Sequence, residues 1–296
     1  MIMLQTNKRK TLNQAVKNIR KKYWPLIKSL QTTLLLITGL AGYMSSRCPV
    51  SNLPILLSLT GSLLLTISGS TVLNMWFDRD IDSRMGRTQR RPLPAKLVQP
   101  NEALSLGLGL FIFGISWAVM LDTLFGLVVF AGFFIDVVIY TIWLKRRTAW
   151  SIIWGGLSGG MPILAGRVLG IGEIDWIGIA LAASVLFWIP THIMTFNIRY
   201  LADYNFAKVP TFASVYGIAT TKKIIAVSSV LAATIMGISA FGVGITIGYF
   251  RIMAVMSAGL LFLAVSSAVN SSEKLIFGLF KYASAYMLSS MILISV

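Results

Sequence analysis

The sequence predicts an all-α, polytopic membrane protein with nine transmembrane helices, and three observations lead to this fold class. Of the 296 residues, 56% are hydrophobic and only 12% are charged, whereas a soluble domain carries about 25% charged residues. The apolar residues are gathered in windows of about 20, the length that a helix needs to cross a bilayer. The basic residues lie between these windows with a strong bias to alternate loops.

Nine apolar windows can be placed along the chain, each bounded by charged or turn-forming residues. They are 24–46, 51–75, 102–121, 123–144, 149–168, 174–196, 221–246, 251–270 and 275–295. The break between the third and fourth windows is the weakest, because only Asp122 and its neighbours interrupt the apolar run. We predict a single transmembrane domain over residues 24–296, preceded by a basic tail over residues 1–23.

The basic residues predict the orientation of these helices. With the N-terminus in the cytoplasm, 22 of the 26 Lys and Arg residues fall in the tail or in loops on the same side of the membrane. This is the positive-inside pattern. Eight spans would place the later basic loops on the opposite side, so nine are favoured. We expect a multi-pass protein of the cell membrane, with its N-terminus cytoplasmic and its C-terminus outside.

The composition also excludes several classes of protein. The net charge of +16 is divided among short segments between apolar runs, so it predicts topology rather than nucleic-acid binding. A single cysteine, Cys48, excludes an intrachain disulfide and a multi-cysteine metal site. Residues 1–22 lack an apolar core, so they do not form a cleavable signal peptide.

An acidic segment follows the second window directly. It carries Asp78, Asp80 and Asp82, and a charge at bilayer depth costs about 2.5–3.5 kcal/mol unless it is paired, hydrated or bound to metal. In a helix, Asn74, Asp78 and Asp82 are spaced i, i+4 and i+8 and share one face. Such a row suits Mg²⁺, with phosphate oxygens of a substrate as further ligands. Asp80 falls on another face, where it could pair with an arginine or reach a second metal.

Arginines follow these acids immediately, among them Arg87 and Arg91. Guanidinium groups bind phosphate oxygens well, so the segment is interpreted as the diphosphate site of a membrane enzyme. The alternative interpretation is a solvated turn in which Arg79 and Arg84 neutralise the acids.

Three motifs occur in order along the chain, within the stretch from about residue 25 to about residue 220. The first is Asn74-x-x-x-Asp78-Arg-Asp80-Ile-Asp82-x-x-Met85-x-Arg87-Thr88-x-x-Arg91-Pro92-Leu93. The second is Tyr140-Thr-Ile-Trp143-Leu-Lys145-Arg146-Arg147-Thr148, followed by Gly155, Gly156, Gly159, Gly160 and Pro162. The third is Pro190-Thr-His192, followed by Asp203-Tyr204 and Ala207-Lys-Val-Pro210. This series resembles the UbiA superfamily of intramembrane prenyltransferases, and within it the branch that farnesylates heme.

The resemblance implies nine helices around a central cavity that opens to the cytoplasm and laterally to lipid. It also implies transfer of a farnesyl group from farnesyl diphosphate to a vinyl carbon of protoheme. Asn74, Asp78 and Asp82 would hold Mg²⁺ and the diphosphate, and Lys145 would join them as a catalytic residue. Arg87 and Arg91 would contact the diphosphate.

The chemistry of the reaction agrees with these residue types. Mg²⁺ and cationic side chains stabilise a departing pyrophosphate, so that an allylic C–O bond can ionise. The carbocation needs a dry site and gains from aromatic faces. Tyr140 is expected to contact the substrate for this reason, although aromatic residues also form ordinary belts at membrane interfaces.

Three further side chains are expected to bind substrate. His192 is the only histidine in the chain; beside heme it would be an axial ligand or a propionate contact, and otherwise it is a satisfied hydrogen-bonding residue. Arg199 and Asp203 are candidates for the diphosphate or the metal. Alternatively, Arg199 and Asp203 form an exposed i, i+4 ion pair with each other, which would stabilise the protein by about a few tenths of a kcal/mol.

Some features stay open. Asp136 stands alone in an apolar run and should face the cavity or be neutral, but no role is assigned to it. The motif at Pro190-Thr191-His192 departs from the Pro-Pro-His of the family, so an aromatic quinone precursor or a lipid alcohol is an alternative acceptor. A heme or cation transporter, the other alternative, would show inverted repeats. Whether a heme-modifying enzyme or a terminal oxidase docks on the chain is also open.

Overall fold

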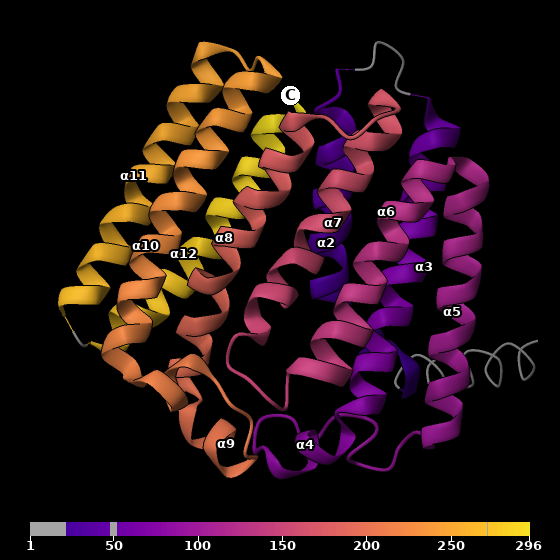
Figure 1. The fold of residues 1–296 in the computed structure, drawn as a ribbon, viewed down its shortest axis with the longest axis vertical. Coiled ribbons are helices and arrows are strands. Elements are labelled where there is room, and N and C mark those ends of the chain that lie inside the picture. The colour runs from indigo at the N-terminus through magenta and orange to yellow at the C-terminus, as the bar shows by residue number, and fades with distance from the viewer. Residues whose placement is uncertain (1–21, 48–51, 271) are drawn as a thin grey trace, which may run out of the picture.

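The apolar runs form long helices in the computed structural model, which describes residues 22–47, 52–270 and 272–296 (Figure 1). Most of the basic tail and Cys48 lie outside the described residues. The long helices are α2 (Ser29–Met44), α3 (Leu53–Phe77), α5 (Pro100–Leu121), α6 (Thr123–Phe134), α7 (Ser151–Ile171), α8 (Trp176–Arg199), α10 (Phe212–Val243), α11 (Ile247–Val269) and α12 (Glu273–Ser295). The short elements are η1 (Trp24–Ile27), α4 (Arg79–Arg84), η2 (Ile135–Leu144) and α9 (Leu201–Phe206).

The nine predicted windows each coincide with one of these long elements. Within the described residues, eight helical stretches are long and apolar enough to cross a membrane, and α6 with η2 forms one of them. The ninth, α2, is shorter at 16 residues. The protein is therefore an all-α, multi-pass membrane protein, as its composition predicts.

The break between the third and fourth windows is real, and Asp122 causes it. Asp122 has an extended backbone, with φ −159° and ψ 135°, between the end of α5 and the start of α6. Its side chain accepts a hydrogen bond from the backbone N–H of Phe125 at 2.7 Å. An aspartate in this position satisfies an N–H group that the first turn of a helix leaves free. A single capping residue thus separates two apolar helices.

The stretch between the sixth and seventh windows is shorter than the sequence predicts. The windows leave residues 197–220 as a long loop, but α8 continues to Arg199 and α10 already begins at Phe212. Thr211 caps α10 by accepting a hydrogen bond from the Ser214 N–H. Gly217, at φ 81°, then interrupts the helix before its apolar part begins. The glycine and the polar stretch 220–223 interrupt the apolar run, so a search for apolar windows misses the start of the helix.

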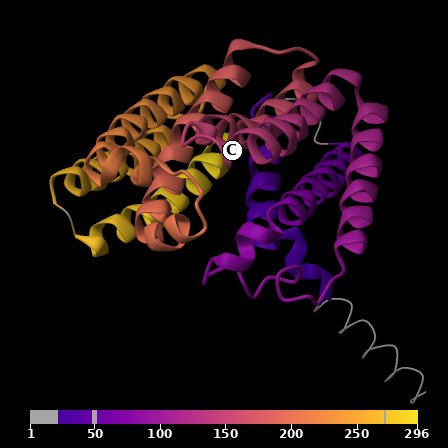
Figure 2. The ribbon, with the colours of Figure 1, turned by 60° about the horizontal axis from the view of Figure 1, so that its bottom comes forward.

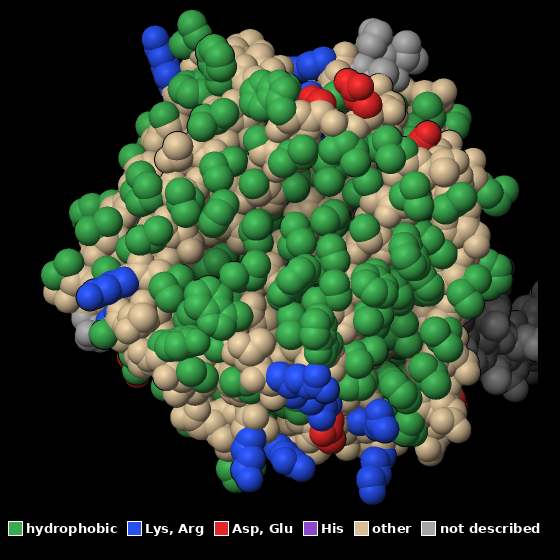
Figure 3. All heavy atoms as spheres, viewed as in Figure 1, with side chains coloured by type: hydrophobic (Ala, Val, Ile, Leu, Met, Phe, Trp, Pro, Cys, Tyr) green, Lys and Arg blue, Asp and Glu red, His purple; other side chains and the backbone are tan. Residues whose placement is uncertain are grey.

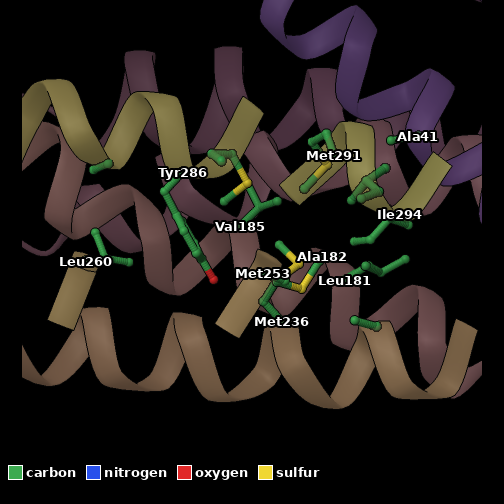
Figure 4. Close-up of a cluster of buried hydrophobic side chains, with 14 of the residues drawn as sticks. Ala41, Leu181, Ala182, Val185, Met236, Met253, Leu260, Tyr286, Met291 and Ile294 are labelled. Carbon is green, nitrogen blue, oxygen red and sulfur yellow. The ribbon is translucent and has the colours of Figure 1, made fainter. Parts of the chain in front are cut away.

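The nine long helices of the described chain close into a ring. Each packs against the next one in sequence, and α12 packs against α2. The core of the C-terminal half lies between α8, α10, α11 and α12, where Leu181, Met236, Met253 and Tyr286 are buried (Figure 4). Hydrophobic side chains cover most of the face seen in Figure 3, and Lys and Arg gather at the end that carries α4 and α9.

The crossing of α2 and α7 depends on glycines. A Cβ atom on Gly42 would lie 2.0 Å from the Ile163 carbonyl oxygen, and one on Gly166 would lie 1.9 Å from the Gly39 carbonyl oxygen. Both contacts are with backbone, which cannot rotate away. Small residues let membrane helices approach this closely, so the crossing fixes α7 beside α2.

Substitution at this crossing should destabilise the protein. We expect Gly166→Ala to lower the free energy of unfolding by about 1–3 kcal/mol or more, because the two backbones must move apart. Gly237→Ala is the control, since nothing lies within 4 Å of a Cβ at that position of α10. Thermal unfolding of both variants in the same detergent, followed by circular dichroism, measures the difference. Equal melting temperatures would contradict the tight crossing.

Candidate functional site

The row of oxygen ligands expected from the sequence is present where α3 meets α4. The Asp78 N–H donates to the Asn74 carbonyl at 2.9 Å, and the Asp82 N–H donates to the Asp78 carbonyl at 2.8 Å. Helical spacing therefore continues through the joint at Asp78, and the three side chains stay on one face. Their exposed fractions are 9%, 5% and 4%, which is unusual for carboxylates and requires partners.

Cations from two other segments neutralise the acids. Lys145, directly after η2, forms an ion pair with Asp78. Arg91 Nη1 donates to both carboxylate oxygens of Asp82, at 2.7 and 2.9 Å. Arg146 donates to both oxygens of Asp80, each at 2.7 Å. Asp80 thus pairs with an arginine, one of the two outcomes that its place on the helix allowed.

The alternative interpretation of the acidic segment is wrong about its partners. Arg79 donates instead to the carbonyl of Trp76 at 2.6 Å, and within the described residues neither Arg79 nor Arg84 forms an ion pair with these acids. The cations come from positions at least nine residues away. They therefore bring separate parts of the chain to one site.

These contacts shift the pKa values of Lys145 and Asp80. Burial disfavours the charged ammonium of Lys145, but the Asp78 carboxylate beside it outweighs that effect and raises the pKa of Lys145 above its usual value. Hydrogen bonds from Arg146 hold the pKa of Asp80 below its usual range. Lys145 consequently stays protonated at neutral and mildly alkaline pH.

Two oxygen atoms of the row have no hydrogen-bond partner. Asn74 Oδ1 and Asp78 Oδ1 are both buried and unpaired in the described structure, although such acceptors normally find a partner. The donor set is hard oxygen, which suits Mg²⁺. The described residues hold no group of three or more His, Cys, Asp or Glu side chains able to bind a metal. The chain thus offers an amide and two carboxylates, and a bound substrate would supply the other ligands.

The segment between α8 and α10 meets the segment between α3 and α5 at this end of the bundle. Asp203 Oδ2 accepts a hydrogen bond from the Arg87 N–H at 3.3 Å. Ile81 and Met85 pack against Ala207 and Val209 in one buried cluster. In Figure 2 the purple segment around α4 lies between the indigo helices and the orange and yellow ones. Asp203 therefore anchors the loop that carries Arg87.

Aromatic rings, rather than acids, hold the two remaining arginines. The Arg87 guanidinium carbon lies 4.7 Å from the centre of the Phe196 ring and 5.5 Å from that of Tyr200. Arg199 lies 3.9 Å from the centre of the Phe277 ring. The i, i+4 ion pair of Arg199 with Asp203 does not form among the described contacts. Stacking leaves the edges of a guanidinium free to donate to an anion.

Tyr140 lies on η2, beside Lys145. The Lys145 Nζ atom is 5.7 Å from the centre of the Tyr140 ring, and the Lys145 N–H donates to the Tyr140 carbonyl at 2.8 Å, five residues back. This is a π-helical hydrogen bond, and π-bulges are frequent at functional sites. Sequence periodicity gave no sign of it.

His192 lies on α8 in an aromatic stack. Its ring is 4.8 Å from that of Trp188 and 4.6 Å from that of Phe280, with interplanar angles of 19° and 21°. Its Nδ1 atom is 3.2 Å from Ser284 Oγ. This contact satisfies one ring nitrogen, and Nε2 makes no hydrogen bond to the described residues.

Asp136 is the site residue to which the sequence gave no role. Its Oδ2 atom accepts hydrogen bonds from Ser70 Oγ at 2.5 Å and from Asn74 Nδ2 at 2.7 Å. The signal in the sequence was an isolated charge in an apolar run. Ser70 carried no signal, except that it precedes Asn74 by one helical turn.

Proteins of a known family are similar to this chain in sequence. The UbiA prenyltransferase family matches residues 35–285. A protoheme IX farnesyltransferase from Korarchaeum cryptofilum is 43% identical over 206 residues, which cover 70% of this chain and 69% of the relative. Another, from Desulforudis audaxviator, is 33% identical over 270 residues, 90% of this chain and 85% of the relative.

Solved structures share the fold. A structure of digeranylgeranylglyceryl phosphate synthase superposes with a TM-score of 0.78 at 17% identity, over 94% of this chain and 98% of the other. A UbiA homologue from Archaeoglobus fulgidus, bound to GPP and Mg²⁺, superposes with a TM-score of 0.66 at 15% identity, over 93% and 100%. With a family match that spans most of its length, the chain belongs to the UbiA prenyltransferase family.

Proposed function

We propose that the chain is a Mg²⁺-dependent prenyltransferase that moves a farnesyl group from farnesyl diphosphate to a vinyl group of protoheme IX, giving heme O. The observation that carries this proposal is the buried row of Asn74, Asp78 and Asp82, which has two oxygens without a hydrogen bond and whose carboxylates pair with Lys145 and Arg91. The relatives named protoheme IX farnesyltransferase support heme as the acceptor, and the homologue bound to GPP and Mg²⁺ supports the donor and the metal.

The diphosphate half of the site activates the donor. Asn74, Asp78 and Asp82 would hold Mg²⁺, which supplies charge stabilisation for the departing pyrophosphate. Lys145 and Arg91 already lie against this row, so their positive charges also face the leaving group. Arg87, stacked on Phe196 and Tyr200, presents its guanidinium edge from the neighbouring loop.

The acceptor half is assigned to α8 and α12. The farnesyl carbon that loses pyrophosphate forms a bond to the terminal vinyl carbon of the porphyrin. Water then adds to the cation left on the inner vinyl carbon and loses a proton, which gives the hydroxyethylfarnesyl side chain. His192 Nε2 is the atom that we assign to the heme iron, because Ser284 occupies Nδ1 and aromatic rings hold the imidazole on both faces.

The orientation follows from the basic residues. We propose that the end bearing α4 and α9 faces the cytoplasm of a cell membrane, where Lys and Arg gather. The site would then receive its charged donor from the cytoplasm, and the acceptor from the lipid phase. With nine helices crossing the membrane, the C-terminus would then lie on the outer side.

The choice of acceptor is the part to test. Membranes containing the protein are given labelled farnesyl diphosphate and Mg²⁺ with equal amounts of protoheme, 4-hydroxybenzoate and geranylgeranylglyceryl phosphate. We expect the label in the porphyrin fraction. We also expect His192→Ala to weaken heme binding, followed by the Soret band, while pyrophosphate-dependent binding of metal is unchanged. Label found only in the aromatic acid or the lipid alcohol would contradict a heme acceptor, while the protein would still be a prenyltransferase.

A further inference from the structure

We propose that Asp136 is a positioning residue that fixes the side-chain amide of Asn74 so that its oxygen faces the metal. This inference rests on the proposed function of the row at Asn74, Asp78 and Asp82. Asp136 itself lies on η2 and reaches α3 from a different helix. A charged group within a membrane helix is costly, so its presence calls for a specific partner.

The hydrogen bonds define what Asp136 does. One oxygen, Oδ2, accepts from Ser70 Oγ at 2.5 Å and from Asn74 Nδ2 at 2.7 Å. Ser70 and Asn74 are one helical turn apart on α3, so they point to the same side. A single carboxylate oxygen therefore receives both donors and ties η2 to the beginning of the row.

The contact leaves Asn74 only one useful orientation. An amide has an acceptor end and a donor end of nearly equal shape, and its neighbours decide between them. Asn74 Nδ2 donates to Asp136 Oδ2, so the NH₂ group of Asn74 faces the carboxylate of Asp136. The opposite atom, Asn74 Oδ1, is then turned away, buried and without a hydrogen-bond partner. Asn74 Oδ1 is therefore the oxygen that is able to bind a cation.

The same segment controls two members of the row. Asp136 lies in η2 and holds Asn74, while Lys145, directly after η2, holds Asp78. η2 is a π-helix, so it has more residues in each turn than an α-helix. Asp136 and Lys145 therefore both reach the side of α3 that carries Asn74 and Asp78. Partners behind the metal ligands commonly change metal affinity by about 10- to 100-fold.

The test is a double-mutant cycle on metal affinity. Mn²⁺ with inorganic pyrophosphate is titrated into the purified full chain in detergent, with free Mn²⁺ measured by electron paramagnetic resonance. We expect Asp136→Leu to weaken Mn²⁺ binding by about 10- to 100-fold. Asp136→Asn keeps an acceptor oxygen for both donors and should stay within about threefold of the wild type. In an Asn74→Ala background, Asp136→Leu should cause no further loss, because the two residues act through one contact.

The outcomes separate this inference from the proposed function. If Asp136→Leu weakens binding equally in the Asn74→Ala background, Asp136 acts directly or through its charge, and the inference is overturned. It is also overturned if Asp136→Leu binds Mn²⁺ as well as the wild type. Wild-type protein that binds no Mn²⁺ with pyrophosphate would overturn both this inference and the metal site. Where Asp136→Leu does not fold, Asp136→Ser replaces it, since its shorter side chain does not reach Asn74.

Discussion

Asp78→Asn and Asp82→Asn should each reduce kcat/KM for farnesyl transfer by about 10³-fold or more, because each removes an anionic ligand from the Mg²⁺ that would stabilise the departing pyrophosphate. Asparagine keeps the size of the side chain and one acceptor oxygen. It therefore leaves the half-buried ion-pair partners, Lys145 and Arg91, with a hydrogen bond. The measurement is the initial rate of product formation in membranes with equal amounts of folded protein. Chelation of divalent metal with EDTA should have the same effect on the wild type.

Asp80→Asn is the matched control for these two variants. Asp80 lies on another face of the helix, its side chain is 51% exposed, and its partner is Arg146. Exposed ion pairs contribute about 0–1 kcal/mol, so the rate should change by less than about fivefold. If Asp80→Asn is as damaging as Asp78→Asn, the metal site extends beyond the row of Asn74, Asp78 and Asp82.

Lys145→Met should lower kcat by about 10²- to 10³-fold, the second large effect that we expect. The raised pKa of Lys145 keeps it protonated, so the substitution removes a full positive charge from beside Asp78. That charge would stabilise the departing pyrophosphate, and one such donor is worth about 10²–10³ in kcat. Single-turnover rates at saturating farnesyl diphosphate separate this loss from a weaker binding of the donor.

Arg147→Met provides the control two residues further along the chain. Arg147 is exposed and makes no ion pair with the described residues, so its loss should leave the rate within about twofold. Lys145→Arg should recover part of the activity, because the charge returns on a longer and wider group. Equal rates for Lys145→Met and the wild type would show that Lys145 is not a catalytic residue.

The sequence predicts most of the fold, because membrane helices are specified by composition along the chain. Nine windows became nine long helices within the described residues, and even the weak break at Asp122 proved to be a helix cap. What apolar runs do not predict are the features built from polar or irregular backbone. Examples are α9, the kink at Gly217 and the π-helix that carries Asp136.

The site was predictable where its residues are neighbours in sequence, and not where they meet across helices. The row of Asn74, Asp78 and Asp82 follows from helical spacing alone. The pairing of Asp82 with Arg91 and of Asp80 with Arg146 depends on how the loops fold back. The partner of Asp136 is 62 residues away in sequence, and only packing of η2 against α3 brings them together. Contacts of this kind need the tertiary structure.

Heme farnesylation that depends on Asp78 can be measured in a single assay. Membranes containing wild-type protein or Asp78→Asn are incubated with protoheme, farnesyl diphosphate and Mg²⁺, and the released pyrophosphate and the porphyrin products are quantified in the same samples by mass spectrometry. We expect one hydroxyethylfarnesyl heme for each pyrophosphate in the wild type, and neither product with Asp78→Asn. Pyrophosphate without a heme product, or heme product that persists in Asp78→Asn, would contradict it.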